Sequence, residues 1–335
     1  MGYEYERHVA AEAVLKACRL TETIRISDSA GKTMEKDDKS PVTVADFSAQ
    51  AAISLELLKA FPDVPMVAEE NLTNLRPDLK EKIFGYVTSA VPGLMHEQIL
   101  AAIDRCDHGG GASGRYWVLD PVDGTKGFLR GEQYAIALAL LENGKVVLGV
   151  LGCPNLPFEL KKPDGPKGCI FVSVVNQGSV MRRIDNLGER LVTVTQVGDP
   201  GTAVFCESVE PDHSSHHDSA RIAEVVGIRR PPVRIDSQCK YGVVARGDVS
   251  IYLRLPTKAG YEEKIWDHAA GWLIVKEAGG EVTDINGHPI DFSTGRVLSR
   301  NTGIVATNGR LHHQVLSAIR RVVGLAGAPS SADNA

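Results

Sequence analysis

Hydrophobic and polar residues follow two periods along the first part of the chain. Apolar residues recur at helical spacing over residues 4–20, 46–60 and 96–106, which predicts three amphipathic helices. Short apolar runs typical of buried strands cover residues 64–68, 116–119, 134–141, 146–152, 169–175 and 180–184. Asn143-Gly144 between two of these runs is a strong hairpin signal. We therefore predict an antiparallel sheet flanked by helices up to about residue 195.

The pattern changes to an alternation of strands and helices after residue 200. Predicted strands cover residues 202–206, 250–255, 281–283 and 303–306, and predicted helices cover residues 218–226, 268–278 and 311–323. This alternation is typical of α/β proteins. We expect an N-terminal α+β domain over residues 1–195, a C-terminal α/β domain over 196–323 and a disordered tail over 324–335.

Composition limits the class of protein without identifying it. The 335 residues are 43% hydrophobic and 24% charged, with a formal net charge of −5, which is typical of a soluble globular protein and argues against nucleic-acid or membrane binding. Six scattered cysteines with no C-x-x-C pair indicate reduced thiols and a cytoplasmic location. The helix over residues 4–20 belongs to the mature fold, since acidic residues interrupt its apolar face. The most apolar stretch, residues 134–153, is broken at 142–145 and cannot span a bilayer.

The most informative string is residues 117–128, WVLDPVDGTKGF, in which a buried strand ends in two carboxylates. Pro121 fixes the backbone, so Asp120, Asp123 and the Val122 carbonyl can face one point, and hard oxygen ligands of this kind suit Mg²⁺. Gly124-Thr125 then opens a predicted helix, whose N-terminus suits a phosphate group. The alternative is an ordinary Asp-Gly turn with a capping aspartate. The complete string favours a site for phosphoryl chemistry.

A second string, residues 265–271, places Trp266-Asp267 before a predicted helix that begins with small residues. Asp267 is expected both to cap that helix and to act as a ligand. Together with residues 39–46 and 67–70, the two strings resemble the signatures of the lithium-sensitive phosphatase superfamily, which includes inositol monophosphatases and 3'(2'),5'-bisphosphate nucleotidases. The strings at residues 125–131, 213–216, 236–241 and 252–256 resemble the bisphosphate nucleotidases more than the inositol monophosphatases. The resemblance spans residues 4–322.

The resemblance implies a layered αβαβα sandwich with its site between the sheets, and it implies roles for particular residues. The implied ligands of two or three Mg²⁺ ions are Glu69, Asp120, Val122 through its carbonyl, Asp123 and Asp267. Thr125 is implied to activate the attacking water, with Asp46 as the base behind it. The implied substrate contacts are Gly124, Thr125, His213, Ser237, Lys240, Arg254 and Asp267.

Several of these residues have plainer interpretations. Asp46 can be the N-cap of the helix over 46–60, Lys240 and Arg254 can be solvated charges, and Glu70 can be a supporting or a surface acid. His213, His216 and His217 suggest either a metal site or a loop and helix start in which only His213 reaches the ligand. Lys126 and Arg130 are weaker candidates for steering an anionic substrate.

The activity that the resemblance implies is Mg²⁺-dependent hydrolysis of a phosphomonoester by attack of a metal-activated water. The expected substrate is adenosine 3',5'-bisphosphate, which gives AMP and phosphate, with 3'-phosphoadenylyl sulfate as a second substrate. The implied role lies in sulfur metabolism, and inhibition by Li⁺ is expected. The alternatives are inositol polyphosphate 1-phosphatase activity and a nucleotide-binding sensor that has lost catalysis. No nucleic-acid or membrane partner is expected, and the protein is expected to be a monomer or a homodimer.

Overall fold

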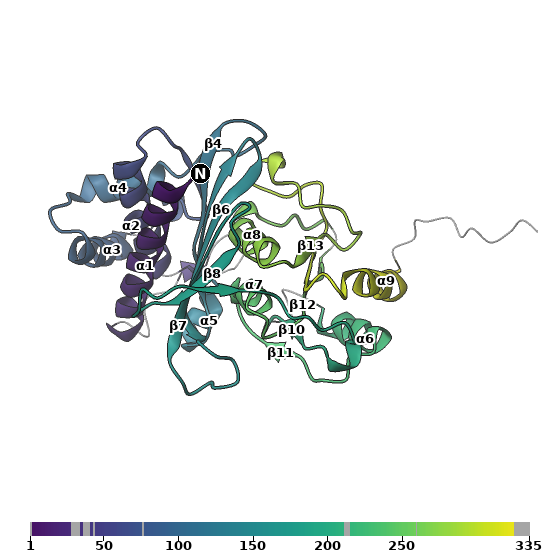
Figure 1. The fold of residues 1–335 in the computed structure, drawn as a ribbon. Coiled ribbons are helices and arrows are strands. Elements are labelled where there is room, and N and C mark those ends of the chain that lie inside the picture. Colours follow the sequence, from purple (N-terminus) through teal and green to yellow (C-terminus); the bar gives the residue numbers. More distant parts are fainter. Residues whose placement is uncertain are drawn as a thin grey trace, which may run out of the picture.

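The computed structural model describes residues 2–27, 34–35, 41–42, 44–75, 77–210, 215–258 and 260–324. Within these ranges the chain forms five layers: helices, a seven-stranded sheet, two helices, a five-stranded sheet and two further helices (Figure 1). This order of layers confirms the expected αβαβα sandwich. The predicted tail lies outside the described residues, apart from Gly324.

The seven-stranded sheet has the order β3-β4-β5-β6-β7-β8-β9. Its strands are β3 (Met66–Ala68), β4 (Arg115–Asp123), β5 (Ala135–Glu142), β6 (Lys145–Pro157), β7 (Lys167–Val174), β8 (Ser179–Arg183) and β9 (Arg190–Val192). The edge strand β3 runs parallel to β4, and all other neighbours in this sheet are antiparallel. The predicted antiparallel sheet is therefore confirmed except at β3, where a long connection allows parallel pairing. Asn143 and Gly144 have φ angles of 50° and 73° and form the predicted tight turn.

Helices lie on the outer side of this sheet. Helices α1 (Glu4–Ser27) and α2 (Val44–Ala60) pack against its face, and α3 (Pro77–Ala90) and α4 (His96–Asp104) pack against α2. A small ribbon is formed by β1 (Met34–Glu35) and β2 (Pro41–Val42). Helix α1 continues past the predicted end at Leu20, because Thr21 and Ile24 are buried and the Thr21 hydroxyl lies 2.9 Å from that of Tyr134. Packing thus overrides the low helix propensity of β-branched residues.

The middle layer consists of α7 (Cys239–Ala245) and α8 (Ala269–Glu277), which lie between the two sheets (Figure 1). A Cβ atom on Gly271 would lie 2.2 Å from the Tyr241 ring. The small residues that begin α8 therefore allow the predicted close approach.

The five-stranded sheet has the order β11-β10-β12-β14-β13 and contains both parallel and antiparallel neighbours. Its strands are β10 (Phe205–Glu207), β11 (Val233–Arg234), β12 (Ile251–Arg254), β13 (Glu281–Thr283) and β14 (Ile304–Thr307). Helices α6 (His216–Val226) and α9 (His312–Val323) cover its outer face. The chain passes from the first sheet to the second between Val192 and Phe205, and the domain boundary at 195/196 stays a prediction.

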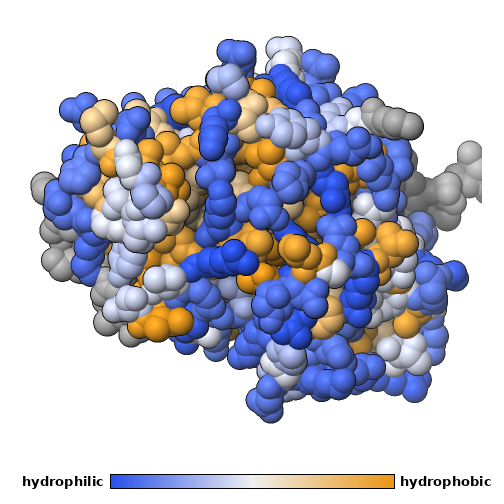
Figure 2. Space-filling model, turned by 60° about the vertical axis from the view of Figure 1, so that its left-hand side comes forward, coloured by the Kyte–Doolittle hydropathy of each residue, from blue (hydrophilic) through white to orange (hydrophobic). Residues whose placement is uncertain are grey.

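Hydrophilic side chains are spread over the face shown in Figure 2, with hydrophobic side chains interspersed among them. All six cysteines fall in the described ranges, and each is a buried, unpaired thiol. In the part of the chain that the structure describes, no helix is long and apolar enough to cross a membrane.

Candidate active site

A pocket with a volume of about 310 Å³ lies beyond the ends of β3 and β4 and is closed by residues of the second half of the chain. This volume is in the range of small-ligand sites. The pocket is lined by acids (Glu69, Asp120, Asp123, Glu210, Asp236, Asp267), bases (Lys126, Lys240, Arg254, Lys264), aromatic residues (Tyr252, Tyr261, Trp266) and Val122, Gly124, Thr125, Gly127, Ser237 and Gln238. The structure therefore brings together all the described metal-ligand and substrate-contact candidates.

A bulge at the end of β4 aims two of the carboxylates. Asp120 pairs with Ala137 and Asp123 with Ala135, so β4 carries one more residue than β5 across this stretch. An extra residue bends a strand and redirects its side chains. Gly124 follows with a φ of 84°, and helix α5 (Thr125–Arg130) begins after it. Asp123 does not cap α5, because Gly124 holds the N-cap position, and its carboxylate instead accepts a hydrogen bond from the Gln238 N–H at 2.5 Å. The plain Asp-Gly turn with a capping aspartate is therefore the wrong interpretation.

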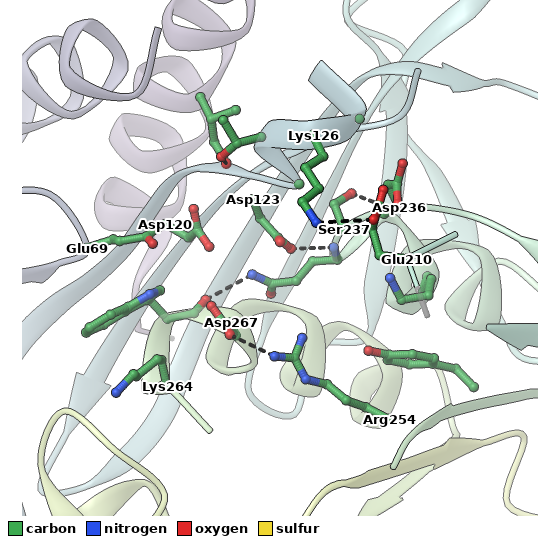
Figure 3. A pocket seen from close by; sticks show the side chains of 18 of the residues that line it. Glu69, Asp120, Asp123, Lys126, Glu210, Asp236, Ser237, Arg254, Lys264 and Asp267 are labelled. Carbon is green, nitrogen blue, oxygen red and sulfur yellow. Dashed lines mark hydrogen bonds and ion pairs between the residues drawn. The ribbon is translucent and has the colours of Figure 1, made fainter. Parts of the chain in front are cut away.

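Four carboxylates surround a common space in Figure 3, where Glu69, Asp120, Asp123 and Asp267 point toward one another from three parts of the chain. Burial and the charges of Glu69, Asp123 and Asp267 raise the pKa of Asp120 well above its usual range. Burial also raises the pKa of Asp267 to about 7, although Arg254 and His268 oppose the shift. Burial and the repulsion between neighbouring carboxylates thus both disfavour the ionised forms of Asp120 and Asp267.

The cluster fits a divalent cation. Asp120 is 2% exposed, and its Oδ1 atom has no hydrogen-bond partner within the described ranges. A buried carboxylate oxygen without a partner is costly unless a cation or a proton is nearby. Carboxylate and carbonyl oxygens form the hard donor set that Mg²⁺ prefers. The residues present therefore suit the expected metal, and the number of ions stays a prediction.

Asp46 and Thr125 approach the cluster from different elements. Asp46 is buried in the first turn of α2, which begins at Val44, so it is not the N-cap that its sequence position suggested. Its charge contributes to the raised pKa of Asp120. The Thr125 hydroxyl donates to the Val122 carbonyl at 3.3 Å. The water-activating role of this pair stays a prediction.

Asp267 lies in the 3₁₀ helix η3 (Ile265–Asp267), and His268 takes the N-cap position of α8. The expectation that Asp267 caps α8 is therefore wrong. Its carboxylate instead lies 3.3 Å from the Arg254 guanidinium and lines the pocket (Figure 3). The chain turns sharply between the two helices, which moves the cap one residue further along.

Two of the cations that line the pocket are held by the surrounding protein. Lys240 is 4% exposed and donates to the Ile235 carbonyl at 3.2 Å, and burial lowers its pKa. Arg254 forms ion pairs with Glu263 at 2.8 Å and with Asp267 at 3.3 Å. The interpretation of Lys240 and Arg254 as solvated charges is therefore wrong.

Ser237 has a φ of 63°, a left-handed conformation that is uncommon outside glycine, and it lies against Gly124. A Cβ atom on Gly124 would lie 3.0 Å from the Ser237 Cβ. The substrate candidate His213 lies outside the described residues. His216 begins α6 and its Nε2 lies 2.8 Å from the Ser208 carbonyl, which fits the loop-and-helix-start interpretation at this position.

Other charged candidates have clear surroundings. Glu70 is buried and its backbone is held by the Gln50 side chain, so it is not a surface acid, and it does not line the pocket. Lys126 and Arg130 lie near the pocket but both form ion pairs with Glu210, at 3.3 and 2.6 Å (Figure 3 shows Lys126 and Glu210).

Two supporting residues received no role from the sequence. The Gln238 side chain donates to the Trp266 carbonyl at 2.9 Å, and its backbone N–H donates to the Asp123 carboxylate. Gln238 therefore connects Asp123 to the segment that carries Asp267. Glu263 lies between Arg254 and His268; burial opposes its ionisation, but these two neighbours outweigh burial and lower its pKa to about 2. Gln238 lies within the string 236–241, and Glu263 lies two residues before the string 265–271. Their closeness to these strings is the sequence feature that could have pointed to a supporting role.

Comparisons with known proteins identify similar sequences along nearly the whole chain. The sequence pattern of the inositol monophosphatase family matches residues 3–323. A 3'(2'),5'-bisphosphate nucleotidase of Emericella nidulans is 44% identical, over 97% of this chain and 100% of that protein. A 3'(2'),5'-bisphosphate nucleotidase of Oryza sativa is 45% identical, over 96% of this chain and 95% of that protein.

Solved structures share the fold. An IMPase of Thermotoga maritima has a TM-score of 0.65 at 23% identity and covers 94% of this chain and 96% of its own. An inositol monophosphatase from Anabaena has a TM-score of 0.64 at 19% identity and covers 99% of this chain and 100% of its own. With relatives above 40% identity along nearly its whole length, the chain belongs to the inositol monophosphatase family.

Proposed function

We propose that this protein is a Mg²⁺-dependent phosphomonoesterase that removes the 3'-phosphate of adenosine 3',5'-bisphosphate. The observation that carries the proposal is one pocket that joins a carboxylate cluster to two cations, the buried Lys240 and the partly buried Arg254. A bisphosphorylated nucleotide needs both, because the carboxylates serve the reacting phosphate and cations must hold the other. The names of the similar nucleotidases support this substrate class.

The residues proposed to hold Mg²⁺ are Glu69, Asp120, Asp123, Asp267 and the Val122 carbonyl, all of which line the pocket. When bound, two or three such ions supply positive charge that stabilises the phosphoryl group and favour the ionised form of a water nucleophile. This chain's part is to hold the carboxylates close together and partly shielded from solvent, so that a bound cation would offset their mutual repulsion.

The proton is moved by Thr125 and Asp46 in this proposal. The Thr125 hydroxyl accepts the water proton as it passes its own to Asp46, and the oxygen of the water forms a bond to phosphorus while the bond from phosphorus to O3' breaks. O3' keeps the bonding electrons and takes a proton from solvent water to become the 3'-hydroxyl, and Asp46 returns its proton to solvent. The products are AMP and phosphate. Asp46 is 1% exposed, which suits a base held at a fixed position.

The second phosphate and the nucleoside are proposed to bind on the other side of the pocket. Lys240 and Arg254 attract the phosphate, while Ser237, Gly124 and His213 contact the nucleotide. Since 3'-phosphoadenylyl sulfate carries the same 3'-phosphate, it is proposed as a second substrate. A cytoplasmic location and a monomeric or homodimeric state complete the proposal.

A substrate comparison tests the proposal. Phosphate release is measured with adenosine 3',5'-bisphosphate and with inositol 1,4-bisphosphate at equal concentration and saturating Mg²⁺. We expect the nucleotide to have the higher kcat/KM. Faster turnover of the inositol compound would favour inositol polyphosphate 1-phosphatase activity, and tight nucleotide binding without turnover of either would favour a retired sensor.

A further inference from the structure

Arg296 follows Asp267 by some distance in the sequence, but in the fold it lies beside the segment that carries Asp267. The Ile265 N–H donates to the Arg296 carbonyl at 3.1 Å, and the Leu298 N–H donates to the Glu263 carbonyl at 2.8 Å. Lys264 and Val297 form an antiparallel bridge between the two segments. The backbone of Arg296 is therefore fixed to the residues that lead directly into Trp266-Asp267.

The Arg296 side chain reaches in the opposite direction, to the seven-stranded sheet. Its Nη2 donates to the Ala68 carbonyl at 2.6 Å, and its Nη1 donates to the His108 carbonyl at 3.1 Å. Ala68 is the last residue of β3 and directly precedes Glu69. One guanidinium thus holds the strand end that delivers the first carboxylate of the cluster.

The same guanidinium also contacts Trp266, the residue before Asp267. Its carbon lies 5.0 Å from the centre of the Trp266 ring, and Trp266 directly precedes Asp267. The side chain is 32% exposed, so the stacked and hydrogen-bonded groups are partly shielded from water, and Nη1 also lies 3.8 Å from the exposed Asp107 carboxylate. Cation–π contacts and hydrogen bonds to a charged donor both strengthen when water is excluded.

Strand β3 has three residues and lies at the edge of the sheet, with β4 as its one neighbour in that sheet. Across its outer edge, the Ala68 N–H donates to the Cys106 carbonyl, the His108 N–H donates to the Met66 carbonyl, and Val67 bridges to Asp107. The Arg296 fork adds side-chain hydrogen bonds that join this strand end and the loop at His108 to the segment that carries Asp267. A planar fork can hold two carbonyls at once, which a lysine ammonium on a flexible stem cannot reproduce.

We propose that Arg296 is a positioning residue that sets the placement of Glu69 relative to Asp267 and so tunes the affinity of the acid cluster for Mg²⁺. The inference rests on the proposed function in taking these carboxylates as metal ligands. Arg296 is not among the residues that line the pocket, so it acts through the backbone before Glu69 and the ring before Asp267.

Mg²⁺ binding without substrate, measured by calorimetry, tests the proposal directly. The variants are Arg296→Ala and Arg296→Lys, with Arg300→Ala as the matched control, since Arg300 is 73% exposed and pairs with Asp291. We expect a 10–100-fold weaker Mg²⁺ affinity for Arg296→Ala, as is usual when a partner of a metal ligand is lost, with Arg296→Lys in between. Arg300→Ala is expected to bind as the unmodified protein does.

Steady-state kinetics separate positioning from a general loss of structure. With Arg296→Ala we expect turnover to be restored in large part by excess Mg²⁺, with the KM for the nucleotide at saturating Mg²⁺ within about twofold of the unmodified protein, since positioning partners act mainly on metal affinity. Unchanged Mg²⁺ affinity in a folded Arg296→Ala protein would overturn the inference. If that variant does not fold, unchanged affinity in Arg296→Lys would do so. Weakened Mg²⁺ binding in a protein that hydrolyses no nucleotide would instead uphold the inference and refute the proposed function.

Discussion

Replacing Asp120 by asparagine removes one buried charge from the carboxylate cluster with almost no change in side-chain size. Burial and the charges of the four neighbouring acids Glu69, Asp123, Asp267 and Asp46 raise the pKa of Asp120. The ionised form of Asp120 is therefore disfavoured in the metal-free protein. A neutral amide is not repelled by these neighbours, and its N–H groups can donate to them. We therefore expect Asp120→Asn to abolish turnover while stabilising the metal-free fold.

The raised pKa of Asp267 sets the scale of the effect. An acid with a raised pKa in the folded state keeps a proton that the unfolded chain releases, so stability falls as pH rises from the ordinary pKa to the raised one. For Asp267 this window runs from pH 3.8 to about 7. At about 1.4 kcal/mol for each pH unit, the loss above pH 7 is about 4 kcal/mol. For the removal of the one charge at Asp120 we expect the free energy of unfolding of the metal-free protein to increase by about 1–3 kcal/mol at pH 8.

Thermal unfolding after dialysis against EDTA measures this gain. In a domain-sized protein about 1–3 kcal/mol corresponds to a rise in Tm of about 2–6 °C. The rise is expected at pH 8 and should shrink toward pH 4, because the raised pKa values of Asp120 and Asp267 favour their neutral forms as the pH falls. Mg²⁺ should then stabilise the unmodified protein and leave Asp120→Asn nearly unaffected, because a ligand stabilises a fold only in proportion to its binding.

A surface variant provides the control. Asp185 pairs with Arg183 and its side chain is 62% exposed, so Asp185→Asn removes an equal charge outside the cluster and should leave both the Tm and its Mg²⁺ response unchanged. A metal-free Asp120→Asn protein that unfolds at or below the Tm of the unmodified protein at pH 8 would refute the charge-crowding argument. So would Mg²⁺ stabilisation equal to that of the unmodified protein.

Three further substitutions test other parts of the site. Lys240→Met should lower kcat/KM for the bisphosphate by about 10–100-fold through KM, since a phosphate loses a buried cation, and steady-state kinetics with unchanged KM would contradict this. Thr125→Ala should lower kcat by at least about 100-fold with KM nearly unchanged, and a rate equal to that of the unmodified protein would exclude the proton relay. Gly127→Ala would place a Cβ atom 2.3 Å from the Gln133 carbonyl, so it should lower the Tm and the activity, and an unchanged Tm would argue against this packing.

Local patterns in the sequence predicted the elements that carry the chemistry. The structure places β4, which ends in Asp120 and Asp123, and the turn before α8 within a few residues of where the two sequence strings predicted them. Strand β13 was predicted with the observed bounds. Helix α3 was not predicted, although Leu79, Ile83 and Val87 recur at helical spacing and are fully buried. Its apolar residues pack against α2 rather than against a sheet, and no predicted strand lies next to α3 in the sequence to suggest that a helix is present.

Long-range contacts within the site could not be predicted in the same way. Arg296 and Ala68 are separated by 228 residues, and Gln238 and Asp123 by 115. No periodicity or turn signal links residues at such separations, because their meeting depends on how the two sheets pack. The surroundings of Lys240 and Arg254 belong to the same class, since both look like surface charges in the sequence. Lys240 is buried in the layer between the two sheets, and Arg254 at the end of β12 forms ion pairs with Glu263 and Asp267.

The most direct test measures phosphate release from adenosine 3',5'-bisphosphate by the purified protein, with Mg²⁺ and after removal of Mg²⁺ by EDTA, and identifies the nucleotide product. We predict equal amounts of AMP and phosphate with Mg²⁺ and none after EDTA, in a protein that stays folded. Phosphate release that continues in EDTA, release of the 5'-phosphate instead of the 3'-phosphate, or no release with Mg²⁺ would contradict the proposed function.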